Sequence, residues 1–385
     1  MNALLAHGGG PTSVINASLA GLVEESRSQG IFQSLYGARF GVRGILDDEL
    51  IDLLQVHTET ILEAGQSPGS ALGSSRQKLG DEDYSRVLRN FDRRNIHCFF
   101  YTGGNGSMDT ALQIARFAKT SGYSLQVIGI PKTIDNDLCV TDHTPGYPST
   151  AHFFALAARD VGEDNRSLPS PVCVLEVLGR NAGWVVAATA LARKQDDDAP
   201  HLIYFPERRV SFDQIAGDTE RVYRRLGRVV IAICEGQLDE TGTPFGADVD
   251  RAASSVHRLA SNLGHTISRL IAEKLGIRAR SEKPGLFGRC CGPLSCNSDR
   301  VEAWACGRAA ALAAADSHSG MMVALRRESG TLYASTTFLT PLESVARVER
   351  LLPDQWISAA GNDVTPELID YISPLVPAIK SYPRL

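Results

Sequence analysis

Residues 125–137 read LQVIGIPKTIDND: a short apolar run, then proline, lysine and threonine, then two aspartates. The apolar part is typical of a buried strand, and ligand sites of open α/β sheets form where strands end. If the segment after the strand is extended, Asp135 and Asp137 point to the same side, because alternate residues share a face. Two neighbouring carboxylates repel each other unless a cation or a shared proton separates them. We therefore interpret residues 131–137 as part of a binding site; the alternative is a solvated acidic loop.

The order of strand, turn and helix recurs along the chain. Apolar runs typical of strands lie at 3–6, 96–101, 126–130, 171–178 and 228–234. Helical patterns lie at 14–25, 108–118, 185–193 and 254–275. This alternation predicts an α/β fold with parallel sheets and helices on both faces.

The composition is that of an ordinary globular protein. The chain has 385 residues, of which 43% are hydrophobic and 22% charged, and its length favours two domains. The net charge of −5 argues against binding to nucleic acid or to a membrane surface. Because we find neither a signal peptide nor an apolar run that could span a bilayer, we expect a cytoplasmic protein.

Two Gly-rich turns are candidates for binding phosphate. Residues 8–10 follow the first predicted strand, and residues 103–107 follow another. Glycine lets backbone N–H groups approach anionic oxygens, and a helix that begins there adds its dipole. Arg76, among small polar residues, could bind the same phosphates through its guanidinium group. Each feature also has a purely structural interpretation: the Gly-rich segments could be tight turns, and Arg76 could be a solvated surface residue. The two turns together nevertheless favour one shared oligophosphate site.

The residues of the 131–137 segment suit phosphoryl transfer to an alcohol. This reaction needs a carboxylate that accepts the alcohol proton, and charge neutralisation around the phosphoryl group. Asp135 is our candidate base, Asp137 our candidate Mg²⁺ ligand, and Lys132 would face the transferring group. Other charged residues in polar or Gly-rich settings could bind a sugar phosphate and its hydroxyls, namely Arg180 (which follows Gly179), Glu235, Arg280 and Arg289.

From residue 8 to about residue 308 the chain resembles the phosphofructokinase family, whose members phosphorylate the 1-hydroxyl of fructose 6-phosphate. The motifs that carry the resemblance are GGNGS at 103–107, PKTIDND at 131–137, TDHTPGY at 141–147 and EVLGRNAGW at 176–184. The resemblance implies two Rossmann-like lobes with parallel-rich sheets flanked by helices, and an active site in the cleft between them. It also implies a homodimer or homotetramer, because in the family an arginine of a neighbouring subunit reaches the sugar phosphate.

We accordingly expect three parts. Residues 1–149 with about 290–325 would form the lobe that binds the donor phosphates, and residues 150–289 the lobe that binds the sugar phosphate. Residues 326–385 would form a C-terminal extension that packs on the lobes.

The matched motifs imply roles for single residues. On the donor side these are Gly10, Arg76, Gly104, Asn105, Gly106 and Ser107. Lys132, Thr133, Asp135 and Gly106 would be catalytic, and Thr133 and Asp135 would also touch the sugar. The sugar phosphate would meet Leu178, Gly179, Arg180, Glu235, Arg280 and Arg289, with Arg280 serving the neighbouring subunit. Mg²⁺ would be held by Asp137 and Asn105.

Some positions depart from the family pattern. Asn105 stands where many ATP-using members have a metal-binding Asp, and Leu286 stands where many have a substrate-binding His. No arginine matches a further interface arginine near Pro171, and Arg166 is a possible substitute. Pyrophosphate users usually combine an Asp at the place of Gly106 with a Lys at the place of Lys132.

Lys132 therefore resembles the pyrophosphate branch, whereas Gly106 leaves room for ATP. Both donors remain open. The acceptor also has alternatives in sedoheptulose 7-phosphate and tagatose 6-phosphate. A non-catalytic regulatory subunit that only binds sugar phosphate is a third possibility, which the presence of Thr133, Asp135, Asp137 and Arg180 disfavours.

Overall fold

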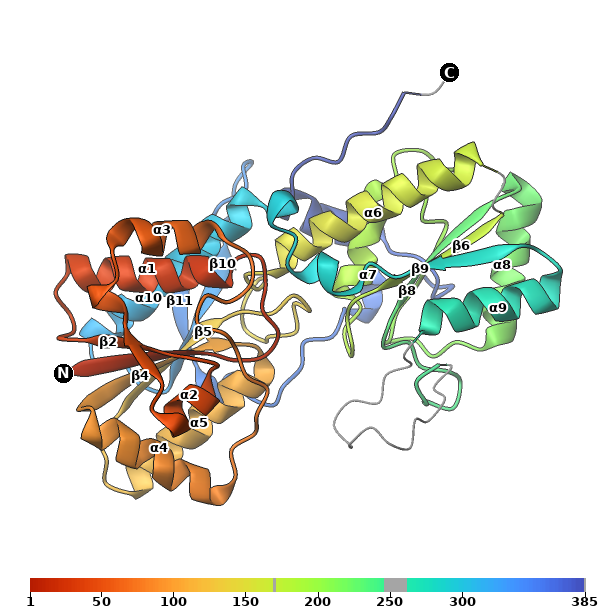
Figure 1. The fold of residues 1–385 in the computed structure, drawn as a ribbon. Helices are drawn as coiled ribbons and strands as arrows, with labels where there is room; N and C mark the ends of the chain where they lie inside the picture. The colour runs from red at the N-terminus through yellow and green to blue at the C-terminus, as the bar shows by residue number, and fades with distance from the viewer. Residues whose placement is uncertain (169–170, 246–261, 384–385) are drawn as a thin grey trace. The chain divides into compact units, whose positions relative to one another are not determined.

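The computed structural model describes residues 1–168, 171–245 and 262–383. Two compact units make up the chain (Figure 1). Unit 1 comprises Met1–Pro148 and Arg289–Arg350, and unit 2 comprises Ser149–Gly288 and Leu351–Leu385. Each unit has a mostly parallel sheet with helices packed on it, which confirms the predicted α/β class.

The sheet of unit 1 has seven strands in the order β11-β10-β5-β4-β1-β2-β3. Its inner strands β10, β5, β4, β1 and β2 are parallel to their neighbours, and β3 and β11 are antiparallel edges. The strands of the N-terminal segment are β1 (Asn2–His7), β2 (Leu35–Ala38), β3 (Leu50–Asp52), β4 (Ile96–Gly103) and β5 (Gln126–Pro131). The central strands are apolar on both faces, as expected of parallel strands covered on both sides.

Helices cover both faces of this sheet. One face carries α1 (Ile15–Ser28), α3 (Thr58–Gln66) and α10 (Asn297–Ala315). The other carries α2 (Val42–Asp47), α4 (Asp81–Arg93) and α5 (Asn105–Thr120) (Figure 1). Along β4, Cys98 and Phe100 pack into the first layer while Phe99 and Tyr101 pack into the second, the alternation of a strand buried on both sides.

The C-terminal part of unit 1 corrects one expectation. We assigned residues 326–385 to an extension, but β10 (Met321–Arg327) and β11 (Ser335–Pro341) form an antiparallel pair within the sheet. β10 also pairs with β5 through Met321 and Met322. Most of the seven residues of β11 are partly or fully exposed, so its weak apolar alternation does not identify it as a strand.

Unit 2 is built on four parallel strands in the order β7-β8-β6-β9. Their bounds are β6 (Val172–Val177), β7 (Leu202–Tyr204), β8 (Val229–Cys234) and β9 (Ala279–Glu282). The associated helices are α6 (Tyr147–Ser167), α7 (Trp184–Ala188), α8 (Phe212–Leu226), α9 (Leu263–Leu275) and α11 (Pro366–Ile372). We predicted one helix over 254–275; α9 covers its second half, and residues 254–261 lie outside the described part.

The chain after unit 1's last strand returns to unit 2. There Trp356 and Tyr371 pack against the buried Trp184 of α7, with ring centroids 5.8 and 5.6 Å from it. Short 3-10 turns complete the elements: η1 (Leu53–Gln55), η2 (Thr189–Ala192), η3 (Gly285–Arg289), η4 (Gly292–Leu294), η5 (Leu342–Ser344), η6 (Asp354–Trp356) and η7 (Ser373–Leu375). Among the described helices, none combines the length and the apolar character needed to cross a bilayer.

Candidate active site

Three turns meet at one edge of the unit 1 sheet. The turn at 8–12 follows β1, the turn at 103–107 follows β4, and residues 131–137, here called the Asp turn, follow β5. Because β5, β4 and β1 are neighbouring parallel strands, their carboxyl ends lie side by side. The topology therefore brings together the three segments that sequence analysis singled out separately.

Lys132 joins the Asp turn to the turn at residues 8–12, here called the glycine turn. Its side chain is 3% exposed, and Nζ donates to the carbonyls of Gly8 at 2.9 Å and Gly10 at 2.7 Å. Burial lowers the pKa of Lys132 to about 8, with the carboxylates of Asp135 and Asp137 opposing the shift. The ammonium group is thus mainly charged at pH 7, and both aspartates of the Asp turn lie close enough to act on it.

Arg76 and Arg289 also lie next to the glycine turn, near Gly10. A methyl group built on Gly10 would lie 2.9 Å from Nη1 of Arg289 and 3.4 Å from Nη2 of Arg76. Both guanidinium groups also lower the pKa of Lys132, as nearby positive charges do. Arg289 was expected among the sugar-phosphate residues of the second lobe, but it belongs to unit 1, at the start of the segment that leads into α10. Sequence reasoning gave no signal for this place.

A hydrogen-bonded loop positions Arg76. His7 is fully buried at the end of β1, and its Nδ1 lies 2.8 Å from Ser70 Oγ, which itself donates to the carbonyl of Gly73. Burial and the charge of Lys132 lower the pKa of His7 to about 3, so the ring is neutral and Nδ1 is the donor. Ser74 Oγ donates to the carbonyl of Gly9 at 2.7 Å, which ties the loop to the glycine turn.

The Asp turn is not extended, contrary to our premise. Asn136 has a φ of 53°, in the left-handed region, and its side-chain oxygen accepts from Thr144 N at 3.0 Å. Thr133 Oγ1 accepts from Asp135 N at 3.1 Å and donates to the Asp137 carboxylate. The two aspartates act on Lys132 because the chain turns around Asn136, and not because alternate residues of a strand share a face.

Asp137 has the features of a cation-binding carboxylate. Its Oδ1 is buried and has no hydrogen-bond partner in the described chain. Burial raises the pKa of Asp137, and the nearby Glu349 carboxylate raises it further, whereas Thr133 and Lys132 lower it. Mg²⁺ commonly binds through one or two carboxylates together with substrate phosphates and waters. Asp137 fits such a site.

Asn105 is engaged elsewhere. Its amide nitrogen donates to the carbonyls of Val345 at 3.3 Å and Val348 at 2.6 Å, and its oxygen accepts from Arg347 N at 2.9 Å. The predicted role of Asn105 as a metal ligand finds no support in these contacts, because the amide holds the segment after η5. Within the described residues, no three His, Cys, Asp or Glu side chains are grouped to hold a metal ion.

The first turn of α5 touches the glycine turn. A Cβ on Gly8 would lie 2.2 Å from Ser107 Oγ, and one on Gly103 2.1 Å from the same atom, so both glycines are required for this approach. The first backbone N–H groups of a helix have no intrahelical acceptor, which suits an anion near Gly104. A Cβ on Gly106 would meet nothing within 4 Å. The side chain of an aspartate, expected at this position in pyrophosphate users, would therefore begin in open space.

In unit 2, two turns press together where β6 and β8 end. Glu235 N donates to Val177 O at 2.9 Å, and a Cβ on Gly236 would lie 1.5 Å from the carbonyl oxygen of Arg180. Gly179, with a φ of 128°, directs its N–H toward Glu235 Oε1 at 3.4 Å. Burial raises the pKa of Glu235, which Gly179 N–H and Arg180 partly oppose. The structure therefore groups Gly179, Arg180 and Glu235, with Leu178 next in the chain.

Arg280 does not join this group. It lies on β9 in register with Cys173, the second residue of β6, whereas Arg180 follows the end of β6. At about 3.3 Å per residue, the position of Arg280 lies about 13 Å before the end of β6. The register places Arg280 away from the turn that carries Arg180, and its role toward a neighbouring subunit stays a prediction.

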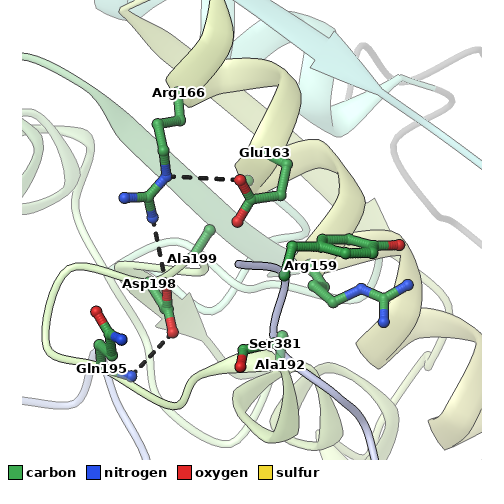
Figure 2. Close-up of a pocket in the computed structure, with 10 residues that line it drawn as sticks. Arg159, Glu163, Arg166, Ala192, Gln195, Asp198, Ala199 and Ser381 are labelled. Carbon is green, nitrogen blue, oxygen red and sulfur yellow. Dashed lines mark hydrogen bonds and ion pairs between the residues drawn. The ribbon is translucent and has the colours of Figure 1, made fainter. Parts of the chain in front are cut away.

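Arg166, the possible substitute near Pro171, is held in an ion-pair network. Figure 2 shows its guanidinium group directed toward Glu163 and Asp198, with N–O distances of 3.7 and 3.3 Å. Asp197 lies 3.0 Å from Nη1. The adjoining cavity has a volume of about 20 Å³, enough for a water molecule but not for a sugar phosphate. These contacts assign Arg166 a structural role.

Comparisons with known proteins extend over nearly the whole chain. The family described as Phosphofructokinase matches residues 2–314. A pyrophosphate–fructose 6-phosphate 1-phosphotransferase of Rhodospirillum rubrum is 39% identical over 380 residues, 97% of this chain and 93% of that protein. A sulfofructose kinase of Alkalicoccus urumqiensis is 32% identical over 361 residues, 93% of this chain and 92% of its own length. The solved pyrophosphate-dependent phosphofructokinase of Marinobacter aquaeolei has a TM-score of 0.88 at 31% identity, covering 100% of this chain and 93% of that one.

Proposed function

Because the chain belongs to the phosphofructokinase family and is therefore a phosphotransferase with an alcohol acceptor, we propose that it phosphorylates the 1-hydroxyl of fructose 6-phosphate, with pyrophosphate as donor. The observation that carries this proposal is the group of Lys132, Arg76 and Arg289 around one glycine turn, beside the carboxylates of Asp135 and Asp137. Phosphoryl transfer depends mainly on positioning and on neutralising charge. A cationic group next to a carboxylate base meets both needs.

The proposal gives each group of residues a step. Backbone N–H groups at 8–10 and 104–107 would bind the donor phosphates, with Arg76 and Arg289 pairing with their oxygens. Asp135 would accept the proton of the sugar hydroxyl, and Lys132 would stabilise charge on the phosphoryl group. Bound Mg²⁺ would neutralise further phosphate charge, with Asp137 holding it. Arg180 and Glu235 would orient the sugar phosphate.

Pyrophosphate is favoured as donor by the relatives' names and by a compact set of charges. The Rhodospirillum and Marinobacter proteins are named as pyrophosphate-dependent, and they cover the chain almost completely. Arg76, Lys132 and Arg289 are concentrated near Gly10, which suits a small, highly charged donor. ATP is the second candidate, because the open space at Gly106 would admit a nucleotide.

Two assays test the proposal. Purified chain with fructose 6-phosphate, Mg²⁺ and either donor should form fructose 1,6-bisphosphate with a higher kcat/KM for pyrophosphate; a higher value for ATP would overturn the donor assignment. Asp135→Asn should lose most of kcat, while Asp316→Asn, at an exposed residue after α10, should keep it. Failure of the purified chain to transfer phosphoryl groups to any acceptor would favour a regulatory subunit.

A different acceptor is the second candidate function. Leu286, where many family members are expected to carry a substrate-binding His, is 65% exposed. A leucine cannot donate a hydrogen bond to a 6-phosphate, so the acceptor could carry another anionic group, as the name of the Alkalicoccus relative indicates for that protein. Comparing kcat/KM for fructose 6-phosphate, 6-sulfofructose, sedoheptulose 7-phosphate and tagatose 6-phosphate would decide between them.

A further inference from the structure

A buried ionic cluster lies behind the Asp turn. His143 is fully buried, Nδ1 donates to Asp142 Oδ2 at 2.9 Å, and Nε2 donates to Glu302 Oε2 at 2.7 Å. Glu302 belongs to α10, and its other oxygen accepts from Tyr333 Oη and, at 2.7 Å, from Ser335 Oγ. Residues that are 159 positions apart in the chain thus share one hydrogen-bonded network.

The cluster is balanced in charge. The two carboxylates raise the pKa of His143 to about 9 against the effect of burial, so the ring is an imidazolium at neutral pH. Arg327 of β10 donates to Asp142 at 3.1 Å and supplies the second positive charge. The groups that face His143 are therefore Asp142 beside it, Glu302 from α10, and Arg327 and Tyr333 behind these carboxylates.

Residues 144–146 connect this cluster to the Asp turn. Thr144 N donates to Asn136 Oδ1 at 3.0 Å, and Thr144 Oγ1 donates to the carbonyl of Thr133 at 2.9 Å. Thr133 N donates to Pro145 O at 3.3 Å. Gly146 N is held in turn by Asp299 Oδ1 of α10 at 2.8 Å. The Asp turn rests on residues 144–146, and His143 anchors this segment to α10 from its N-terminal side.

We propose that Asp142, His143 and Glu302 form a clamp that holds residues 144–146, and through them the Asp turn, in the geometry needed for phosphoryl transfer. His143 is then a positioning residue for Asp135 and Thr133, because it touches neither donor nor acceptor. The part of this inference that concerns catalysis rests on the proposed function. The structural part, that the clamp restrains the Asp turn, is independent of the proposed function.

The test compares His143→Gln with His318→Gln, a matched change at an exposed histidine after α10. The imidazolium ring donates from two nitrogens on opposite sides, whereas a glutamine amide donates only from its single nitrogen. One of the two carboxylates therefore loses its partner. We expect kcat with fructose 6-phosphate and pyrophosphate to fall on the order of tenfold or more, because small misplacements of reacting groups are costly, while KM for pyrophosphate changes less than about threefold. The control should retain both constants.

Hydrogen exchange of the free protein gives the independent readout. In His143→Gln, amides of residues 131–147 should exchange faster, while those of α8 in unit 2 should not change. This measurement needs no substrate, so it decides the clamp even if fructose 6-phosphate proves not to be the acceptor. Unchanged exchange at 131–147 would overturn the proposal, and so would a fall in kcat matched by an equal rise in KM.

Two milder variants serve if His143→Gln does not fold. Tyr333→Phe removes only the hydroxyl that donates to Glu302, and Glu302→Gln keeps the shape of the side chain while removing its charge. Both should show the same pattern with a smaller effect for Tyr333→Phe. In addition, the nitrogen NMR signals of His143 should report a doubly protonated ring at pH 7; a neutral ring would contradict the clamp.

Discussion

Replacing Lys132 with methionine should strongly lower activity while leaving the protein folded. The side chain is 3% exposed, and its ammonium group contacts the carbonyls of Gly8 and Gly10. Methionine has a similar length and no charge, so the change removes the cation and its two hydrogen bonds without a large change in volume. The substitution should therefore lower activity while the protein remains folded.

The expected change in stability is small because two effects oppose each other. The shift of the Lys132 pKa from 10.5 to about 8 corresponds to about 3 kcal/mol against the buried charge, which Lys132→Met relieves. The two carbonyls that lose their donor cost about 1–3 kcal/mol each if they stay buried. The net loss of unfolding free energy should be about 3 kcal/mol at most, measurable by urea denaturation.

The effect on turnover should be at least as large as the upper limit of the effect on stability. Removing a single preorganised donor of transition-state charge lowers kcat by about 10²–10³, equivalent to about 3–4 kcal/mol. Formation of fructose 1,6-bisphosphate from fructose 6-phosphate and pyrophosphate at pH 7 gives the rate. Lys119→Met, at an exposed residue in the last turn of α5, is the matched control and should keep full activity. If Lys132→Met kept a third or more of the kcat, the assignment of Lys132 to the phosphoryl group would be refuted.

Four further outcomes are expected. The kcat of the wild-type protein should fall as pH rises through about 8, because the ammonium group of Lys132 loses its proton; a flat profile from pH 7 to 9.5 would contradict its role. The pKa of His143 is raised from 6.5 to about 9 in the folded state, so its contribution to stability, about 3 kcal/mol, should be complete below pH 6.5 and lost as pH rises through 9; urea denaturation should show this loss in the wild type and not in His143→Gln. Gly106→Asp should fold normally, because its side chain meets open space, and should suppress the use of ATP more than that of pyrophosphate; equal kcat/KM ratios before and after the change would rule out the steric argument. Asp137→Asn should raise the Mg²⁺ concentration needed for half-maximal rate, since a neutral amide holds the ion less strongly; an unchanged Mg²⁺ titration would remove Asp137 from the metal site.

Local patterns in the chain were sufficient to predict the strands and turns that form the site. The apolar runs before 8–10, 103–107 and 131–137 became β1, β4 and β5, and Gly8 and Gly103 fell where a Cβ would collide with Ser107. These features depend on neighbouring residues and on backbone sterics, so they can be recognised without knowledge of the fold. The parallel order of strand and helix also implied that the turns would gather at one edge.

The conformation of the Asp turn could not be predicted from the sequence pattern. Asn136 adopts a left-handed φ because its side chain accepts from Thr144 N and the turn is packed on residues 144–146. A pattern of alternating residues cannot reveal this, since the cause is a hydrogen bond across eight positions. Likewise, Asn105 resembles a metal ligand in its motif but is used by the backbone of residues 345–348, far along the chain.

The amino-acid order alone specifies which Gly-rich turns follow strands and where carboxylates and a lysine stand together, because these properties belong to short segments. Which charges surround those segments depends on the fold. Arg289 lies beside Gly10, and Glu302 beside His143, only because α10 and the segment before it pack onto the sheet that β1 and β5 build. Long-range packing sets the distances between charges, and these distances set the pKa values on which the chemistry depends.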